Sequence, residues 1–331
     1  MTVLEAIQKS AEFLARKGVD SPRLQTELLL AHLLKLPRMK LYLNFERTLA
    51  PAEVDGLREF IKRRGQREPL QHIIGSTSFC GFEITVNRHA LVPRPETEPL
   101  AESGWEFLLA APKQSEGGST LNCTPNAFGA QPSTALDFGT GTGCIAIALA
   151  VKCPSAKVVA TDISPDALAL AKENAARNNV VERIEFLQSD GFAAFQSEGR
   201  VTRVPNSEIE TKIRDSCNSS LRKMEFDLII SNPPYIPSVE IATLQPEVRD
   251  FDPRAALDGG ADGLDFYRKL AVEAKPFLKP GGKIMLEFGD GQADAIRKIF
   301  EAEKWIVEAV KEDYSHRARI VIAQPNKFSH R

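Results

Sequence analysis

From Thr134 to Gln324 the sequence alternates short apolar runs with longer segments whose apolar residues recur every three or four positions. The short runs predict strands at 134–138, 157–162, 184–189, 226–231, 283–288, 306–310 and 319–324. The longer segments predict helices at 145–151, 165–178, 266–278 and 293–302. This alternation predicts an α/β fold with a doubly wound, mostly parallel sheet, in which ligands bind at the carboxyl ends of the strands.

A glycine-rich loop follows the first predicted strand and opens a helix. Its residues are Gly139, Thr140, Gly141, Thr142 and Gly143. Because glycines let a backbone pass close to a ligand, we expect this loop to bind a cofactor. Cys144 stands where the dinucleotide fingerprint G-x-G-x-x-G requires its third glycine, and no G-K-[ST] phosphate loop follows.

Acidic residues end the next two predicted strands. Asp162 lies 19 residues after Gly143, where a carboxylate can accept hydrogen bonds from ribose hydroxyls. Asp190 ends the third strand and is placed for an adenine edge. The pattern favours a nucleoside cofactor without a pyrophosphate, which S-adenosylmethionine fits better than NAD. It therefore indicates a class I, Rossmann-like methyltransferase domain, and the alternative is a nucleotide-fold domain without activity.

A rigid segment ends the fourth predicted strand, in the stretch F-D-L-I-I-S-N-P-P-Y. Two prolines cannot donate to a sheet ladder, so the chain leaves the sheet here. Asn232 Oδ1 and the carbonyl of Pro233 can each accept one N–H of a planar amide or amine, and Tyr235 can stack on that group. Residues 232–235, Pro234 included, are the predicted substrate site, with Asn232, Pro233 and Tyr235 catalytic. The alternative is an ordinary strand-to-loop exit.

The first 72 residues have a different pattern, with apolar residues at helical spacing and proline at the start of two segments. They predict a small helical bundle, either a structural cap or a protein-docking domain. This region holds 13 Lys/Arg and 9 Asp/Glu, a net charge of +4. Residues 73–90 predict two short strands around Gly81, a β-hairpin linker, and 91–331 form the predicted catalytic domain.

Three segments of the catalytic domain are expected to lack regular structure. Two prolines hold Leu91–Glu98 extended until a helix that follows Thr97, so Arg94, Glu96 and Thr97 are expected at the rim of a cleft. Residues 113–133 and 197–223 are polar and lack periodicity, and they are predicted to be flexible surface insertions.

Composition excludes several classes of protein. The net charge of −2 gives no global basic field for bulk nucleic-acid binding. The five cysteines are scattered without a C-x-x-C pair, so neither a metal site nor a disulfide framework is expected, and a reduced cytoplasm is the simplest location. The N-terminal segment is amphipathic rather than a signal peptide, and no run of ~18 apolar residues predicts a membrane span.

Six segments carry a resemblance to a known family. They are R-E-P-L-Q-H-I-I-G at 67–75, F-C-G-F-E-I-T-V at 79–86, L-V-P-R-P-E-T-E at 91–98, D-F-G-T-G-T-G-C-I-A-I at 137–147, S-N-P-P-Y-I at 231–236 and A-L-D-G-G-A-D-G-L-D-F-Y-R at 256–268. Together they resemble the HemK/PrmC family, the protein-(glutamine-N5) methyltransferases that modify peptide chain release factors. The resemblance covers nearly the whole chain outside the two insertions.

The resemblance implies a cofactor, a partner and a substrate site. S-adenosylmethionine is expected over Gly139–Gly143, Asp162, the segment after Asp190, and Asn232. The N-terminal bundle is expected to contact the release factor, whose Gly-Gly-Gln glutamine would enter beside Asn232–Tyr235. Some members carry a bulky aromatic where this chain has Gly191, so Phe192 is the residue expected to cover the adenine.

Two other functions share parts of this pattern. An adenine- or guanine-N methyltransferase acting on nucleic acid would use the same N-P-P-Y platform, but the catalytic half carries a net charge of −6. A non-catalytic binding protein would use the helical bundle alone and would not need the glycine loop, Asp162 and Asn232. Nothing in the sequence demands more than a monomer.

Overall fold

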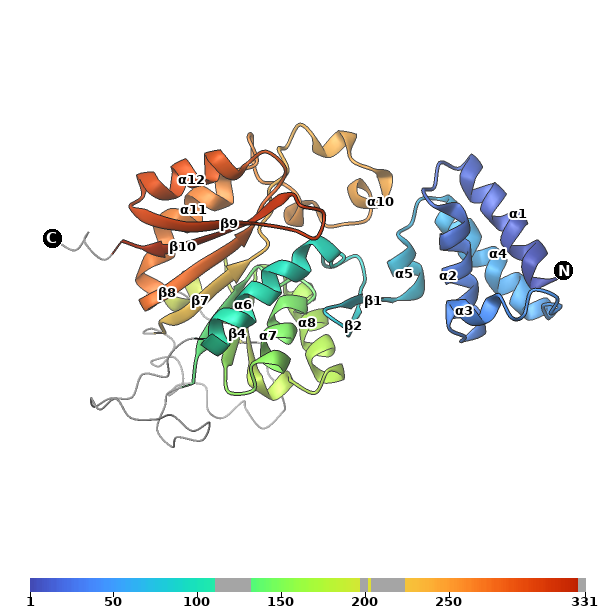
Figure 1. Cartoon of the computed structure of the whole chain (residues 1–331), viewed down its shortest axis with the longest axis horizontal. Helices are drawn as coiled ribbons and strands as arrows, with labels where there is room; N and C mark the ends of the chain where they lie inside the picture. Colours follow the sequence, from blue (N-terminus) through green and yellow to red (C-terminus); the bar gives the residue numbers. More distant parts are fainter. Residues whose placement is uncertain (111–131, 197–201, 204–223, 327–331) are drawn as a thin grey trace. The chain divides into compact units, whose positions relative to one another are not determined.

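The computed structural model describes residues 1–110, 132–196, 202–203 and 224–326, which fall into two compact units (Figure 1). The N-terminal unit comprises Met1–Thr77, Thr85–Arg88 and Ala242–Asp252. The sheet unit comprises Ser78–Ile84, His89–Ile241 and Pro253–Arg331. Most of the two expected insertions, 113–133 and 197–223, lies outside the described residues.

The N-terminal unit is helical, as the sequence predicts. Its helices are α1 (Val3–Arg16), α2 (Pro22–Leu34), α3 (Arg38–Leu41), α4 (Pro51–Gly65), α5 (Leu70–Ile74) and α10 (Pro246–Arg249). The apolar faces of α1 to α5 form one core that includes the fully buried Leu14, Leu29 and Leu57. Thr2 and Glu5 close a capping box at the start of α1, which satisfies two backbone N–H groups that the helix leaves without partners.

A β-hairpin follows α5. Its strands β1 (Ser76–Phe79) and β2 (Phe82–Thr85) pair around Cys80 and Gly81, which have φ angles of 50° and 81°. Positive φ at both central residues matches the twist of a tight hairpin. Ile73 and Ile74 belong to helix α5, although the sequence analysis counted them in the hairpin linker at 73–90.

The sheet unit contains an eight-stranded sheet in the order β6-β5-β4-β3-β7-β8-β10-β9. The strands are β3 (Thr134–Phe138), β4 (Lys157–Asp162), β5 (Ile184–Gln188), β6 (Thr202–Arg203), β7 (Phe226–Ser231), β8 (Leu278–Glu287), β9 (Trp305–Glu312) and β10 (Ala318–Pro325). β5, β4, β3, β7 and β8 are parallel, and β6, β10 and β9 pair antiparallel to their neighbours. The chain builds outward from β3 to β5 and then returns to place β7 on the other side of β3.

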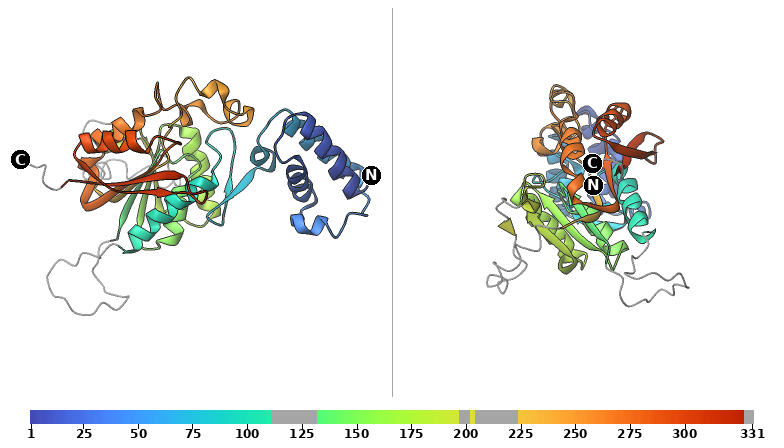
Figure 2. Two further views of the ribbon diagram at one scale, coloured as in Figure 1. Left: turned by 45° about the horizontal axis from the view of Figure 1, so that its top comes forward. Right: turned by 90° about the vertical axis from the view of Figure 1, so that its left-hand side faces the viewer.

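Helices cover both faces of this sheet (Figures 1 and 2). They are α6 (Glu98–Ala110), α7 (Cys144–Lys152), α8 (Pro165–Arg177), α11 (Asp265–Glu273) and α12 (Ala293–Ala302). Leu136 and Ile229 share a core cluster with Tyr267 of α11 and Phe300 of α12. Ile230 points the other way, toward Gly104 of α6. None of the helices in the described ranges has the length and apolar content that a bilayer span requires.

Two expected boundaries are wrong. The predicted helix at 266–278 ends as α11 at Glu273, and β8 begins already at Leu278. The sheet tolerates the Pro280-Gly281-Gly282 segment because the pairing of β7 with β8 shifts register there. The chain before α6 is also not extended up to Thr97, because Pro95–Thr97 forms a short 3₁₀ helix.

Candidate active site

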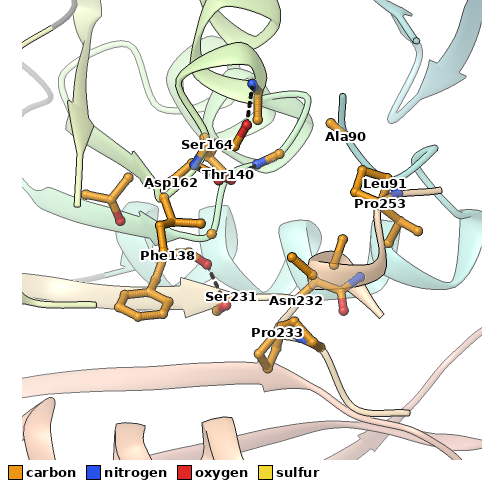
Figure 3. Close-up of a pocket in the computed structure, with 18 of the residues that line it drawn as sticks. Ala90, Leu91, Phe138, Thr140, Asp162, Ser164, Ser231, Asn232, Pro233 and Pro253 are labelled. Atoms are coloured by element: carbon orange, nitrogen blue, oxygen red, sulfur yellow. Dashed lines mark hydrogen bonds between the residues drawn. The ribbon is translucent and has the colours of Figure 1, made fainter. Parts of the chain in front are cut away.

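A cavity of about 400 Å³ lies at the carboxyl ends of the parallel strands, where the chain switches from one side of β3 to the other. β3 and β7 are neighbours in parallel register, and the hydroxyl of Ser231 donates to the carbonyl of Phe138 at 2.6 Å. The glycine loop after β3 and the Asn232 segment after β7 therefore line one cavity (Figure 3). Its volume is in the range of about 300–1,000 Å³ usual for small-molecule sites.

The glycine loop has a backbone that only glycine adopts readily. Gly139, Gly141 and Gly143 have φ angles of 72°, 56° and 82°. A Cβ at Gly143 would lie 3.0 Å from the Cβ of Ala171 on α8, so the loop and α8 pack too closely for a larger residue. Gly139 to Thr142 line the cavity, and Gly143 is the N-cap of α7.

Asp137 anchors this loop, a role that the sequence analysis did not assign. Its Oδ2 accepts hydrogen bonds from Thr140 Oγ1 at 2.6 Å and from the Ala146 N–H at 3.1 Å. The residue is fully buried, and its Oδ1 has no hydrogen-bond partner among the described residues. Burial raises the pKa of Asp137 to about 7, although those two hydrogen bonds oppose the rise.

Asp162 lines the cavity at the end of β4, as predicted (Figure 3). Its Oδ2 accepts from the Gly141 N–H and its Oδ1 from the Ser164 N–H, both at 2.9 Å. Burial raises the pKa of Asp162 above its ordinary value. Each carboxylate oxygen keeps a second lone pair, so Asp162 can hold the loop and still accept a ribose hydroxyl.

Asp190 and Gly191 also line the cavity, together with a lysine that the sequence analysis missed. Lys269 of α11 forms an ion pair with Asp190, with 3.0 Å between Nζ and Oδ1. A Cβ at Gly191 would lie 2.9 Å from Lys269 Nζ, and the φ of Gly191 is 63°. Lys269 therefore occupies the space next to the strand end where an aromatic side chain at position 191 would lie.

Phe192 does not cover the cavity, contrary to the expectation from sequence. It is 1% exposed, and its ring stacks on Phe277 with centroids 4.7 Å apart and an interplanar angle of 3°. It also packs against Phe138 at 5.1 Å. The positive φ at Gly191 turns the chain inward, so Phe192 belongs to the core beneath the site.

Asn232, Pro233 and Pro234 line the cavity at the end of β7 (Figure 3). Asn232 Nδ2 donates to Thr97 Oγ1 at 3.1 Å. Thr97 and Arg94 also line the cavity, in agreement with their expected place at the rim of a cleft, whereas the described lining does not include Glu96. The P-R-P-E-T-E and N-P-P-Y segments therefore meet through one side-chain hydrogen bond.

Tyr235 lies one step further from the cavity than expected. The lining, as far as the described residues define it, does not include this residue. Its ring edge lies 3.0 Å from where a Cβ would stand at Gly289, and its carbonyl accepts from Gln292 Nε2 at 2.9 Å. Burial raises the pKa of the Tyr235 phenol. These contacts make Tyr235 an anchor of the segment that carries Asn232.

The cavity suits S-adenosylmethionine. Its wall offers a glycine backbone for close approach and the Asp162 carboxylate for ribose. Carboxylates favour the two cationic groups of this cofactor, an ammonium and a sulfonium. Within the described ranges no three His, Cys, Asp or Glu side chains are grouped to hold a metal ion. Fold and site define a class I S-adenosylmethionine-dependent methyltransferase.

Comparison with known proteins identifies the family. Residues 5–75 match the PrmC N-terminal domain, and residues 121–204 match the methyltransferase small domain. A release factor glutamine methyltransferase from Geobacter sulfurreducens is 40% identical, covering 90% of this chain and 88% of that protein. One from Chlorobaculum tepidum is 37% identical, covering 95% and 94%. The chain belongs to the release factor glutamine methyltransferase family, which confirms the resemblance found in its sequence.

A more distant likeness is to a methyltransferase from Pyrococcus furiosus of known structure. It aligns with a TM-score of 0.43 and 20% identity, over 74% of this chain and 90% of that one.

Replacing Asp162 with alanine is expected to raise the Kd for S-adenosylhomocysteine about 10- to 100-fold, because each hydrogen bond to a charged group contributes about 1.5–3 kcal/mol. Isothermal titration calorimetry measures this Kd. Glu173→Ala, which removes an exposed acid of α8 paired with Arg177, is the control and should leave the Kd unchanged. An Asp162→Ala protein that binds within twofold of the wild type would contradict the assignment.

Proposed function

We propose that this protein transfers a methyl group from S-adenosylmethionine to the side-chain amide nitrogen of the glutamine in the Gly-Gly-Gln motif of peptide chain release factors. Family membership supports this substrate. The observation that carries the proposal is the engagement of Asn232 Nδ2 by Thr97 at 3.1 Å, next to the glycine loop. With Nδ2 occupied, Oδ1 is the atom of Asn232 that can accept an N–H from a substrate amide.

The proposed chemistry is positioning and charge stabilisation. An amide nitrogen is a poor nucleophile because its lone pair is delocalised into the carbonyl group. S-adenosylmethionine supplies the electrophilic methyl when bound. Asn232 Oδ1 and the Pro233 carbonyl accept the two N–H groups of the glutamine, which fixes the nitrogen in line and stabilises the positive charge that it develops. Pro234 closes the substrate side of the platform. After methyl transfer, the nitrogen loses its extra proton to water.

The proposed roles of the other residues follow from their positions around the cavity. Gly139 to Gly143 and Asp162 hold the cofactor, and Asp190 with Gly191 lies at its adenine end. Tyr235 holds the platform in register through its contacts at Gly289 and Gln292.

The N-terminal unit is the proposed docking domain for the release factor. Large apolar side chains are exposed at and just after α3, with Met39 67% and Leu43 77% exposed, as is typical of a protein-binding surface. The net charge of +4 over residues 1–72 adds a mild preference for an acidic partner surface. The protein is proposed to act as a monomer in the cytoplasm, without a nucleic-acid substrate.

Labelled S-adenosylmethionine tests the substrate class directly. The protein is incubated separately with a purified release factor, with RNA and with DNA, and we expect label on the release factor alone. Label on nucleic acid instead would support the amino-group methyltransferase that shares the platform. No transfer to any of these substrates, together with no binding of S-adenosylhomocysteine, would support a non-catalytic binding protein.

A further inference from the structure

Glu287 ends β8 and lies next to Thr97 and Asn232, yet it does not belong to the wall of the cavity as the described residues define it. It is 2% exposed, and its Oε2 has no hydrogen-bond partner in the described part of the chain. The Tyr267 hydroxyl donates to the Glu287 carbonyl at 2.7 Å and fixes this strand end. Burying a carboxyl with an unpartnered oxygen costs free energy, so the position calls for a functional reason.

The contacts of Glu287 determine which group donates in the hydrogen bond between Thr97 and Asn232. Its carboxylate is stabilised by hydrogen bonds from the side chains of Thr97 and Asn232. A carboxylate only accepts, so the Thr97 hydroxyl proton points to Glu287 and Thr97 Oγ1 is left to accept from Asn232 Nδ2, at 3.1 Å. Without the carboxylate, the Thr97 hydroxyl could equally donate to Asn232 Oδ1 and turn the amide around.

We propose that Glu287 is a positioning residue that holds the Asn232 amide with Nδ2 turned toward Thr97 and Oδ1 turned toward the substrate. This inference rests on the proposed methyl transfer to a glutamine amide. Glu287 acts through Asn232 and does not touch the reacting atoms.

Protonation of Glu287 would remove this control, because a carboxylic acid also donates. Burial raises the pKa of Glu287 to about 7, against the hydrogen bonds from Thr97 and Asn232 and the positive charge of Arg319. Glu96 raises it further, and Tyr235 and Tyr267 are the other titratable groups facing the carboxyl. Arg319 also pairs with Asp290 and Asp313. The carboxyl is therefore ionised above a pH of about 7 and neutral below it.

The test is the pH dependence of kcat for release-factor methylation, in wild type and in Glu287→Gln. The wild type should lose about tenfold in kcat as the pH falls through 7 and then level off, because the protonated carboxyl sets the direction no better than a glutamine does. Glu287→Gln should lack this decline and show kcat about tenfold lower at pH 8. The glutamine amide both donates and accepts, so it no longer forces the Thr97 hydroxyl to accept from Asn232. Its Kd for S-adenosylhomocysteine should stay within twofold of the wild type.

Matched variants separate positioning from simple packing. Glu308→Gln, on β9 of the same sheet, removes a carboxylate that pairs with Lys283 and should keep the wild-type pH profile. Thr97→Val keeps the side-chain volume but removes the hydroxyl and should lower kcat, and Thr97→Ser should recover it. Combining Thr97→Val with Glu287→Gln should cost no more than either change alone. A Glu287→Gln protein with the wild-type decline, or with wild-type kcat at pH 8, would overturn the proposal.

A substrate-free readout keeps this proposal separate from the proposed function. With ¹⁵N-asparagine labelling, the side-chain amide signal of Asn232 should titrate with a midpoint near pH 7 in the wild type and not in Glu287→Gln. If that titration is seen while no release factor is methylated at any pH, the positioning is supported and the proposed substrate is wrong. If the Asn232 signal does not respond to Glu287, the positioning is wrong whatever the substrate.

Discussion

Asn232→Ala should lower kcat about 100-fold while leaving the Kd for S-adenosylhomocysteine within a few fold of the wild type. In the proposed mechanism the variant removes an acceptor aimed at the nitrogen on which positive charge develops, and a preorganised group of this kind contributes about 10²–10³ to the rate. Because Nδ2 contacts Thr97 rather than the cofactor loop, cofactor affinity should change little. Single-turnover methylation of a release factor measures the chemical step.

Val239→Ala provides the control for Asn232→Ala. Val239 follows the same platform and is 78% exposed, so its truncation should change neither kcat nor binding. If Asn232→Ala retained near-normal kcat, the platform would not carry the reaction.

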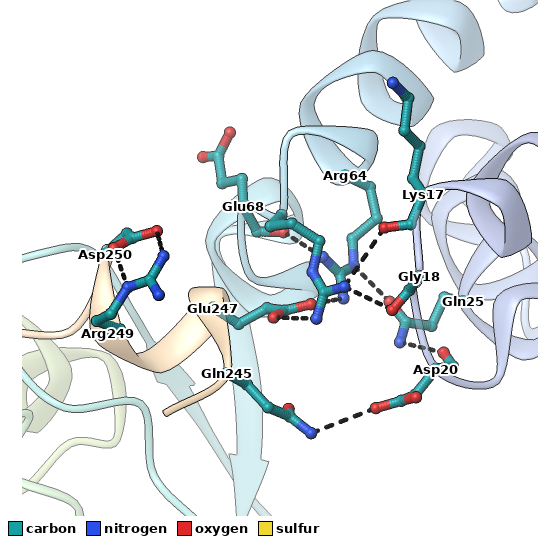
Figure 4. A network of polar contacts seen from close by, with 11 residues as sticks. Lys17, Gly18, Asp20, Gln25, Arg64, Glu68, Gln245, Glu247, Arg249 and Asp250 are labelled. Atoms are coloured by element: carbon teal, nitrogen blue, oxygen red, sulfur yellow. Dashed lines mark hydrogen bonds and ion pairs between the residues drawn. The ribbon is translucent and has the colours of Figure 1, made fainter. Parts of the chain in front are cut away.

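Glu247→Ala is expected to destabilise the N-terminal unit by about 3–5 kcal/mol, because it leaves a buried guanidinium unpaired. Glu247 Oε1 lies 2.6 Å from Arg64 Nη2, and Oε2 lies 2.7 Å from Arg67 Nη2 (Figure 4). The Arg64 side chain is 4% exposed and also donates to Gln25. Hydrogen exchange of the α4 amides measures the loss locally, without assuming that the whole chain unfolds in one step.

The same contact predicts a pH dependence of stability. Burial tends to raise the pKa of Glu247, but the hydrogen bonds from Arg67 and Arg64 outweigh it and lower the pKa below its ordinary value of 4.5. A carboxyl whose pKa is lowered by folding stabilises the fold above its ordinary pKa. This stabilisation is lost as the pH falls and the folded carboxyl becomes protonated. Protection of α4 should therefore decline in acid in the wild type and be flatter in Glu247→Ala.

Asp250→Ala is the matched control on the same segment. Asp250 pairs with Arg249 at 2.7 Å, but both side chains are exposed, so removal of this pair should leave exchange unchanged. Equal exchange in Glu247→Ala and wild type would contradict a structural role for the network.

The conformation of the glycine loop could be predicted from sequence because its signals are local. Gly139, Gly141 and Gly143 follow a buried strand, and their positive φ angles are what their residue type suggests. Asp162 and Asn232 stand at strand ends, which parallel pairing brings to one edge of the sheet. Strand order then places these residues around one cavity without further information.

The features that could not be predicted from the sequence depend on contacts between distant segments of the chain. Phe192 follows Asp190 by only two positions, but its ring direction depends on the turn at Gly191 and on Phe277 from a distant segment. The inclusion of Ala242–Asp252 in the N-terminal unit depends on Glu247 meeting arginines some 180 residues earlier in the chain. No local sequence pattern in residues 242–252 predicts that contact.

Glu287 left a faint signal in the sequence. It is the one acidic residue in the otherwise apolar run Ile284–Phe288, which the sequence analysis treated as a plain strand. A lone carboxyl at the carboxyl end of a buried parallel strand points to a site, but its partners Thr97 and Asn232 come from segments far away in the chain.

Mass spectrometry of a purified release factor, after incubation with this protein and S-adenosylmethionine, tests the central claim most directly. The predicted result is one added methyl, which fragment ions place on the Gly-Gly-Gln glutamine, and which is greatly reduced when Asn232→Ala replaces the wild type. A methyl on another residue, or an unmodified release factor beside an enzyme that binds S-adenosylhomocysteine, would contradict it.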